Sequence, residues 1–241
     1  MGRGEGRRLS GTAAADLRGY AICTEPRSGS VYLCQLLAST GVLGEPTEYF
    51  NAATLRARGH TDYPDDPEGQ LAQISRLGAT PNGVYGVKLF SNHFDYARET
   101  RWAERLPRLS FVYLTRLDLL GQAISHVRAA QTQQWVAQRP ALREPVYDSE
   151  AINAELLRLA RAQARWTYFL SRNDMPVVHV IYEHLVQNPQ LFVDAIARLV
   201  GVTEPATIDM SKVRVRPQRD AINDDWRARF VSQARNLSLF L

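Results

Sequence analysis

The stretch that decides the fold is CTEPRSGSVYLCQLLASTG, Cys23–Gly41. It runs from a short apolar strand, predicted over Gly19–Thr24, through a tight polar turn into a helix that Gly41 is suited to end. The turn PRSGS (Pro26–Ser30) places a glycine and two hydroxyls where the helix begins. Backbone N–H groups at a helix start attract anions, and Arg27 adds a fixed positive charge. The turn therefore predicts an anion site, although a Ser-Gly-Ser helix cap without any ligand explains it equally well.

Along the rest of the chain, short apolar strands alternate with longer helices. Strands are predicted over Val84–Phe90, Leu109–Thr115 and Pro176–Tyr182, and helices over Gln70–Leu77, Asp118–Trp135, Ser149–Arg172 and Asn188–Gly201. This alternation predicts an α/β fold with a central parallel sheet flanked by helices and joined by right-handed crossovers. We expect one domain over residues 19–241, preceded by a flexible N-terminal arm over residues 1–18.

Composition and charge narrow the class of protein. The chain has 241 residues, is 45% hydrophobic, and carries 29 basic against 25 acidic residues, a net charge of +4. This mild positive charge suits an anionic ligand, but it suits a nucleic-acid binder as well. No apolar stretch reaches the length of a membrane span, and the basic N-terminal segment lacks the apolar region of a signal peptide, so a cytoplasmic protein is expected.

The cysteines and histidines do not indicate a metal protein. Cys23 and Cys34 both occupy apolar positions, which predicts two reduced, packed thiols rather than a disulfide. No Cys/His cluster has the spacing of metal ligands, so no metal site is predicted.

Three cations stand at or near the ends of predicted strands, namely Arg27, Lys88 and Arg116. Ligands of parallel sheets bind at the carboxyl ends of the strands, so cations gathered there predict a polyanionic ligand. Arg116 and Ser125, nine residues later on the following helix, can together hold a second phosphate away from the first. The plainer alternative is that Arg116 pairs with Asp118 on the surface.

The nucleotide-kinase pattern G-x-x-x-x-G-K-[ST] is absent. The turn has no lysine, and Val31 stands where a hydroxyl would hold magnesium, so ATP-driven phosphoryl transfer is disfavoured. A P-loop-like nucleotide kinase and a non-catalytic nucleotide-binding or nucleic-acid-binding module remain the alternatives. A binding module of that kind has a spread-out basic face, whereas here the cations focus on strand ends.

Several segments resemble, in the same order, the Stf0-type sulfotransferases, the group of the mycobacterial trehalose sulfotransferases. These segments are PRSGSVYLCQLLASTGVLGEPTEYFN, TPNGVYGVKLF, TRLDLLGQAISHVRAAQTQQW and DAINDDW, and the resemblance extends from about Tyr20 to Phe230. It implies a P-loop-like three-layer sandwich that binds 3′-phosphoadenosine 5′-phosphosulfate. It also implies transfer of the sulfuryl group, without a metal, to a hydroxyl of a carbohydrate or small metabolite, and a homodimer.

The resemblance further implies roles for individual residues. The 5′-phosphosulfate would lie against Arg27, Ser28, Gly29, Ser30 and Val31, and the 3′-phosphate against Arg116 and Ser125. Glu48 matches the glutamate that serves as the candidate general base in the family, because a carboxylate can accept the proton of the attacking hydroxyl. Lys88 would stabilise charge on the transferring group, and His93 is the alternative base.

Plainer explanations and two departures from the family qualify these roles. Glu48 is also explained as a solvated loop acid or a salt-bridge partner, and Lys88 as a strand-end cation whose stem packs while its charge reaches water. Val31 replaces a threonine that is usual in the family. The stretch between Phe50 and Thr80 is much shorter than in the trehalose sulfotransferases, where it shapes the acceptor site, so the resemblance does not identify the acceptor.

Overall fold

The computed structural model describes residues 16–135, 140–215 and 221–234. Among these residues, one sheet of four parallel strands has the order β2-β1-β3-β4. The strands are β1 (Arg18–Cys23), β2 (Val84–Leu89), β3 (Leu109–Thr115) and β4 (Val177–Ile181). Near-continuous apolar runs form β1, β2 and β3 because parallel strands are buried on both faces.

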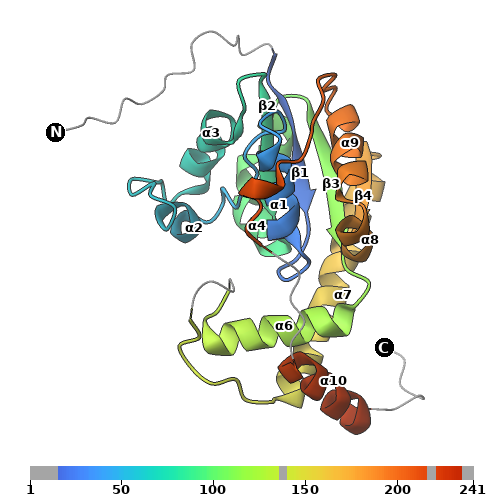
Figure 1. Ribbon diagram of the computed structural model, residues 1–241. Helices are drawn as coiled ribbons and strands as arrows, with labels where there is room; N and C mark the ends of the chain where they lie inside the picture. Colours follow the sequence, from blue (N-terminus) through green and yellow to red (C-terminus); the bar gives the residue numbers. More distant parts are fainter. Residues whose placement is uncertain (1–15, 136–139, 216–220, 235–241) are drawn as a thin grey trace, which may run out of the picture.

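Helices follow each strand, as the alternation of elements predicts (Figure 1). They are α1 (Ser30–Ser39), α2 (Ala52–Arg56), α3 (Pro67–Gly78), α4 (Ser91–Ala97), α5 (Trp102–Arg105), α6 (Leu119–Thr132), α7 (Ser149–Arg172), α8 (Tyr182–Gln187), α9 (Pro189–Leu199) and α10 (Ala221–Ala234), with the 3-10 turns η2 (Arg98–Thr100) and η3 (Met210–Lys212). The long helices agree with the sequence-based prediction within a few residues. The start of α3 is earlier than predicted, at Pro67, because the Asp66 side chain caps it by accepting from Gly69 N–H.

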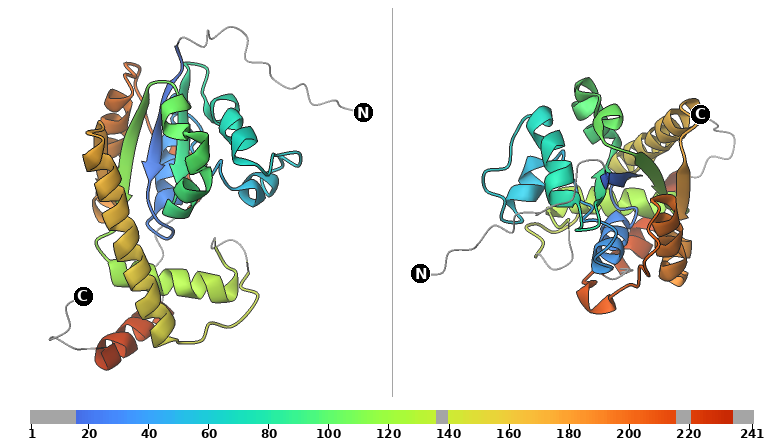
Figure 2. Two further views of the ribbon diagram at one scale, coloured as in Figure 1. Left: turned by 180° about the vertical axis from the view of Figure 1, so that it is seen from behind. Right: turned by 90° about the horizontal axis from the view of Figure 1, so that it is seen from above.

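The two faces of the sheet carry two cores, which confirms the three-layer sandwich. Successive strand residues point to opposite faces. Tyr20 and Ile22 therefore pack with α1, α8 and α9, whereas Ala21 and Cys23 pack with α3, α4, α5 and α7 on the other face (Figure 2). Cys23 and Cys34 are buried free thiols, as expected.

A third cluster lies beyond the carboxyl ends of the strands, in what we call the α6–α10 lobe. It consists of Ile124, Val127, Ile152, Trp226 and Phe230, contributed by α6, the start of α7, and α10. The 24 residues of α7 span about 36 Å, long enough to pack on the sheet at one end and on this lobe at the other (Figure 1). The strand ends that were predicted to hold the ligand therefore face the lobe.

Only the last residues of the predicted N-terminal arm, residues 16–18, are described by the structure. Residues 1–15, most of the expected arm, lie outside the described residues, so that part stays a prediction. β1 begins at Arg18, one residue before the predicted strand. In the described part of the chain, no helix has the length and apolar character needed to cross a bilayer.

Candidate active site

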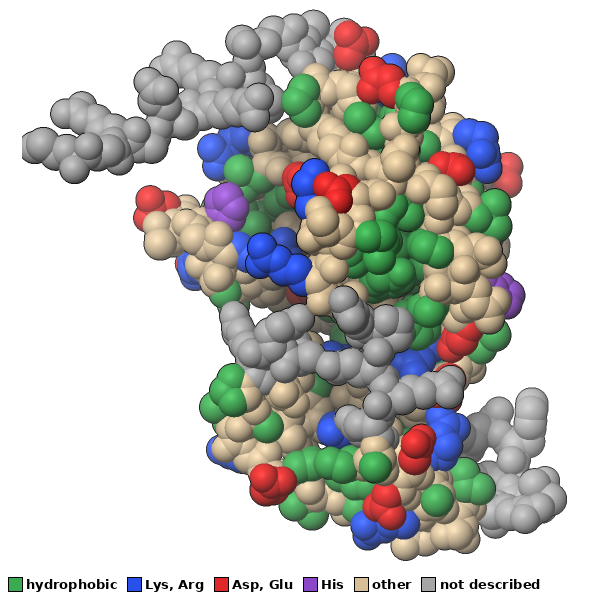
Figure 3. All heavy atoms as spheres, viewed as in Figure 1, with side chains coloured by type: hydrophobic (Ala, Val, Ile, Leu, Met, Phe, Trp, Pro, Cys, Tyr) green, Lys and Arg blue, Asp and Glu red, His purple; other side chains and the backbone are tan. Residues whose placement is uncertain are grey.

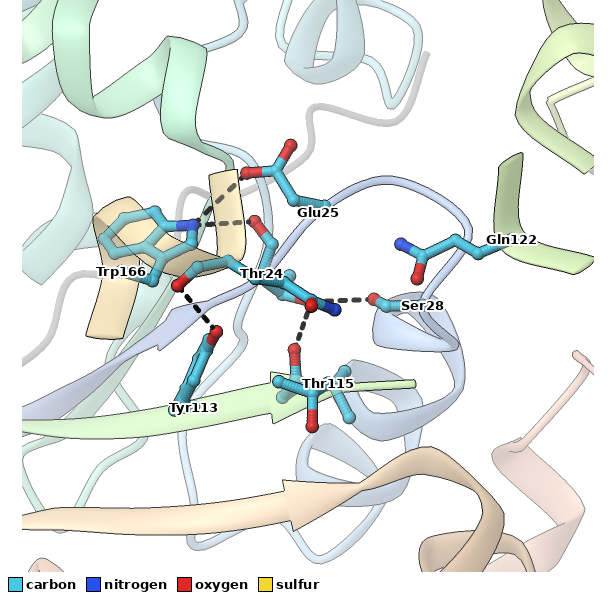
Figure 4. A pocket seen from close by; sticks show the side chains of 9 residues that line it. Thr24, Glu25, Ser28, Tyr113, Thr115, Gln122 and Trp166 are labelled. Atoms are coloured by element: carbon cyan, nitrogen blue, oxygen red, sulfur yellow. Dashed lines mark hydrogen bonds between the residues drawn. The ribbon is translucent and has the colours of Figure 1, made fainter. Parts of the chain in front are cut away.

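The turn between β1 and α1 is fixed by hydroxyl groups on its inner side. Thr24 Oγ1 donates to the Leu114 carbonyl at 2.8 Å, so Ser28 Oγ is the donor in its 2.7 Å bond to Thr24 Oγ1 (Figure 4). Gly29 adopts φ 87°, and a Cβ atom built on it would lie 2.1 Å from the ring of Tyr182. Only glycine therefore fits at this position.

The start of α1 is available for an anion. α1 begins at Ser30, and no side chain among the described residues caps it; the Ser28 hydroxyl is engaged with Thr24 instead. Val31, in the first turn of the helix, brings no polar side chain. The first N–H groups of a helix have no partner within the helix and carry its positive dipole end. This geometry favours the anion site over the alternative in which the serines cap the helix.

Arg27 connects the turn to α6. Its Nε donates to Ser125 Oγ and its Nη1 to the Trp135 carbonyl, both at 2.8 Å, and Arg116 Nη1 donates to the Arg27 carbonyl at 3.2 Å. Burial, together with the charges of Arg116 and Arg128, lowers the pKa of Arg27. Cations that lie this close repel one another, and a bound anion would relieve that repulsion. Lys and Arg side chains are visible where the sheet meets the α6–α10 lobe (Figure 3).

Arg116 contacts two carboxylates only loosely. Its Nη2 lies 3.6 Å from Asp118 Oδ2 and its Nε 3.8 Å from Glu183 Oε1, while the guanidinium stands 5.4 Å from the ring centre of Tyr182. The buried Nε atom has no hydrogen-bond partner within the described residues. Arg116 does pair with Asp118, as the plainer alternative predicts. Among the described residues, the pairing leaves N–H groups of Arg116 without an acceptor, and a phosphate could accept from them.

On the other side of the turn, the segment after α1 brings Glu48 to Lys88. Thr47 pairs with Val87 in parallel, and Lys88 N–H donates to the Thr47 carbonyl at 2.8 Å, so this segment extends the sheet edge beside β2. Lys88 Nζ then lies 2.8 Å from Glu48 Oε1. Asn51 Nδ2 donates to the other carboxylate oxygen at 2.8 Å.

The charges of this group leave two proton acceptors at neutral pH. Burial acts to raise the pKa of Glu48, but the charge and hydrogen bond of Lys88 outweigh it and hold that pKa below its usual value. Burial lowers the pKa of His93, although the Glu48 carboxylate acts in the opposite direction. Phe90 N–H donates to His93 Nδ1 at 3.4 Å. The carboxylate is therefore ionised and the imidazole neutral.

The sequence-predicted residues thus form two groups at the carboxyl ends of the strands. Arg27, Arg116 and Ser125, expected at two different phosphates, are linked by direct hydrogen bonds, with Arg27 common to both contacts. Glu48 and Lys88 form the second group. His93 stacks on Phe90, whose ring centre lies 5.1 Å from Lys88 Nζ. The described residues contain no cluster of three His, Cys, Asp or Glu side chains that could hold a metal ion.

Sequence reasoning missed Glu25, which precedes the turn. Its side chain is 4% exposed and accepts from Ser91 N–H, Trp166 Nε1 and Arg158 Nη1. A small cavity beside it, about 10 Å³, holds no more than about one water. The cavity is therefore too small for a substrate; Figure 4 shows the side chains that line it. The available signal was an acid directly after a continuous apolar strand.

Comparisons with known proteins identify the family of the chain. The sequence matches the model of the Stf0 sulphotransferase family over residues 19–233. Trehalose 2-sulfotransferase of Mycobacterium tuberculosis (strain ATCC 35801 / TMC 107 / Erdman) is 27% identical over 269 residues, covering 92% of this chain and 98% of the relative. Trehalose 2-sulfotransferase of Mycolicibacterium smegmatis (strain ATCC 700084 / mc(2)155) is 27% identical over 264 residues, covering 90% and 95%.

Among solved structures, a sulfotransferase from Alicyclobacillus acidocaldarius aligns with 92% of this chain and 97% of its own, at 15% identity and a TM-score of 0.48. The family model spans most of the chain and includes the PRSGS turn, Glu48, Lys88 and Arg116. The protein therefore belongs to the Stf0 sulfotransferase family and is a sulfotransferase.

Proposed function

We propose that the protein transfers the sulfuryl group of 3′-phosphoadenosine 5′-phosphosulfate to a hydroxyl of a carbohydrate or small metabolite, with Glu48 as general base. The observation that carries this proposal is the Glu48–Lys88 pair. An ionised carboxylate and an ammonium group lie 2.8 Å apart. They lie at the carboxyl end of the sheet, where α1 also begins without a side-chain cap. The two curated relatives are named for trehalose, which supports a sugar hydroxyl as acceptor.

In the proposed step, the acceptor oxygen forms a bond to sulfur while the bond from sulfur to the bridging phosphate oxygen breaks. The electron pair of the broken bond stays on the 5′-phosphate of the departing nucleotide, and the acceptor proton passes to Glu48. Each Glu48 oxygen retains a lone pair beyond its bond to Lys88 or Asn51. Lys88 keeps further N–H donors, which are available to the sulfuryl oxygens.

The two groups of the site divide the work of binding the donor. The start of α1 and the Arg27 charge favour the 5′ end of the donor, where charge develops as the nucleotide leaves. Arg116 and Ser125 would hold the 3′-phosphate. Because the Arg27 side chain already bonds to Ser125, Arg27 is suited to contact both ends of the anionic ligand.

A binding experiment and a transfer assay test this proposal. In calorimetry, we expect 3′-phosphoadenosine 5′-phosphate to bind more tightly than ATP with magnesium, and its affinity to fall sharply in Arg116→Ala. Labelled donor, incubated with trehalose and a panel of other hydroxyl compounds, is then expected to label at least one acceptor. A preference for magnesium-ATP, as the nucleotide-kinase alternative requires, would overturn the proposal.

The resemblance to the family also supports a homodimer in the cytoplasm, and we propose both here as part of the function. Light scattering of the purified chain should give twice the mass of 27.2 kDa. A monomeric mass at the concentrations used for the transfer assay would contradict the dimer without affecting the proposed chemistry.

A further inference from the structure

A buried carboxylate that the proposed reaction does not use lies directly beside the anion-binding turn. Glu25 precedes Arg27 by two residues and is almost fully buried. Its Oε1 accepts from Ser91 N–H at 3.0 Å and from Trp166 Nε1 at 3.2 Å, and its Oε2 accepts from Arg158 Nη1 at 2.7 Å. Figure 4 shows the side chain directed from the turn toward the Trp166 indole.

These bonds join the turn to two other elements of the fold. Ser91 is the first residue of α4, the helix that carries His93 and that follows Lys88 at the end of β2. Arg158 and Trp166 belong to α7, which packs against the same face of the sheet. One carboxylate thus links the backbone of the anion-binding turn with the backbone that leads out of the Lys88 strand.

The charge of Glu25 is part of a longer network. Arg158 also donates from Nε and Nη2 to the two oxygens of Glu155, at 2.8 and 2.9 Å. Glu155 Oε1 lies 3.0 Å from His126 Nδ1 on α6, the helix that carries Ser125. Glu25 is buried, whereas the Arg158 side chain is 41% exposed. Burying a carboxylate costs free energy even when it is paired, so a specific geometry explains its presence here better than stability does.

We propose that Glu25 is a positioning residue that sets the anion-binding turn at a fixed distance from the Glu48–Lys88 pair. The inference rests on the proposed function, because in-line transfer needs donor sulfur, acceptor oxygen and base held in one geometry. A misplacement of about 1 Å can lower a rate by about 10²-fold. Arg116 and Ser125, the proposed contacts of the 3′-phosphate, lie on other segments and bond to Arg27 rather than to Glu25. Loss of the Glu25 link is therefore expected to affect the rate more than the affinity for the nucleotide.

Glu25→Gln is the variant that tests this role. The side chain keeps its size and its Oε1 acceptor for Ser91 and Trp166, but it places an amide N–H₂ group against the Arg158 guanidinium. We expect kcat for sulfuryl transfer to fall by about 10²-fold, with little change in the Kd of 3′-phosphoadenosine 5′-phosphate. A purely structural role would not produce this split between rate and affinity.

A matched control removes another link between the same two helices. Asp95 on α4 accepts from Arg165 on α7 at 3.0 Å, both side chains are about half exposed, and Asp95 forms no bond to Glu25. Asp95→Asn is therefore expected to keep the kcat of the original protein. If Glu25→Gln fails to fold, Arg158→Lys replaces it, because a lysine keeps the charge but cannot bridge Glu25 and Glu155.

A second readout separates this inference from the proposed function. The indole N–H of Trp166 donates both to Glu25 and to the Thr24 carbonyl beside the turn, so its resonance reports how the turn sits against α7. We expect added 3′-phosphoadenosine 5′-phosphate to shift this resonance in the original protein and in Asp95→Asn, and to shift it less in Glu25→Gln, where the bond to Arg158 no longer holds the turn. Absence of any sulfuryl transfer by the original protein would overturn the proposed function, and the Trp166 shift would still decide the role of Glu25. A folded Glu25→Gln protein with unchanged kcat, or with an unchanged Trp166 shift, would overturn the positioning role.

Discussion

Lys88 Nζ lies 2.8 Å from Glu48 Oε1, and the backbone N–H of the same lysine donates to the carbonyl of Thr47. The ion pair is thus fixed by a backbone bond between neighbouring segments as well as by the side chains. The two side chains are only 5% and 16% exposed. Removing one partner of a buried pair typically costs about 3–5 kcal/mol, since the other charge is left without compensation.

Lys88→Met is expected to move the acid limb of the kcat/KM profile to higher pH. Lys88 holds the pKa of Glu48 below its usual value against the opposing effect of burial. Without the ammonium group, burial raises that pKa, so Glu48 becomes protonated and loses its function as a base at a higher pH than in the original protein. The measurement is sulfuryl transfer under kcat/KM conditions across the acidic range.

Lys212→Met provides the control for this experiment. Lys212 also forms an ion pair, 3.0 Å from Asp209, but both side chains are well exposed. Its replacement is expected to leave the acid limb in place. The free energy of unfolding of the original protein provides a second check. The pKa of Glu48 is lower in the folded than in the unfolded protein, so the ion pair stabilises the fold at pH values above the unfolded-state pKa. This contribution is lost as the pH falls through the folded-state pKa. An unmoved acid limb in Lys88→Met contradicts the electrostatic coupling.

Glu48→Gln is expected to lower kcat by about 10²–10⁴-fold, the usual contribution of a general base. The amide keeps an acceptor for Lys88 and nearly the same shape, so the Kd of 3′-phosphoadenosine 5′-phosphate should change little. His93→Gln is the matched comparison, since His93 is the alternative base and is also largely enclosed, at 6% exposed. If His93→Gln loses the activity and Glu48→Gln keeps it, the assignment of the base is wrong.

Arg27→Lys is expected to weaken binding of 3′-phosphoadenosine 5′-phosphate by about 10- to 100-fold, the effect of losing a charged hydrogen bond worth about 1.5–3 kcal/mol. A lysine keeps the charge but cannot donate to Ser125 and to the Trp135 carbonyl at once, as the guanidinium does. Calorimetry measures the change. Arg165→Lys, at an exposed pair on α7, should bind the bisphosphate normally, and equal affinities in the two variants would contradict the role of Arg27.

The sequence was sufficient to predict the sheet and the turn because their signals are local. Each strand is a short apolar run, and α6, α7 and α9 are long enough to show a helical period. The helices α2, α4, α5 and α8 were not predicted, since their four to seven residues are too few to establish that period. α4 matters most among them, because its first residue anchors Glu25.

The contacts of the site could not be predicted in the same way. Glu25 bonds to Ser91, Arg158 and Trp166, which lie 66, 133 and 141 residues away. Arg27 and Ser125 were predicted to bind different phosphates, and only the fold brings these residues, 98 positions apart, within hydrogen-bond distance. Residue types indicate which groups can bind an anion, whereas their distances depend on how the strands and helices pack.

Gly29→Ala is expected to weaken anion binding at the turn, whereas Gly41→Ala is expected to retain it. Both glycines have left-handed backbone, with φ 87° and 70°, so an alanine at either site meets a similar backbone strain of about 1–2 kcal/mol. The surroundings differ: a Cβ at Gly29 would lie 2.1 Å from the Tyr182 ring, whereas nothing lies within 4 Å of a Cβ at Gly41.

The pair of variants therefore separates backbone strain from loss of the close approach. Thermal unfolding should show a moderate loss of stability for Gly41→Ala and a larger one for Gly29→Ala, because the turn must move away from Tyr182. Movement of the turn displaces the start of α1 from the arginine group, so calorimetry should show weaker binding of 3′-phosphoadenosine 5′-phosphate to Gly29→Ala than to Gly41→Ala. Equal affinities in two folded variants would mean that the contact between Gly29 and Tyr182 does not shape the anion site.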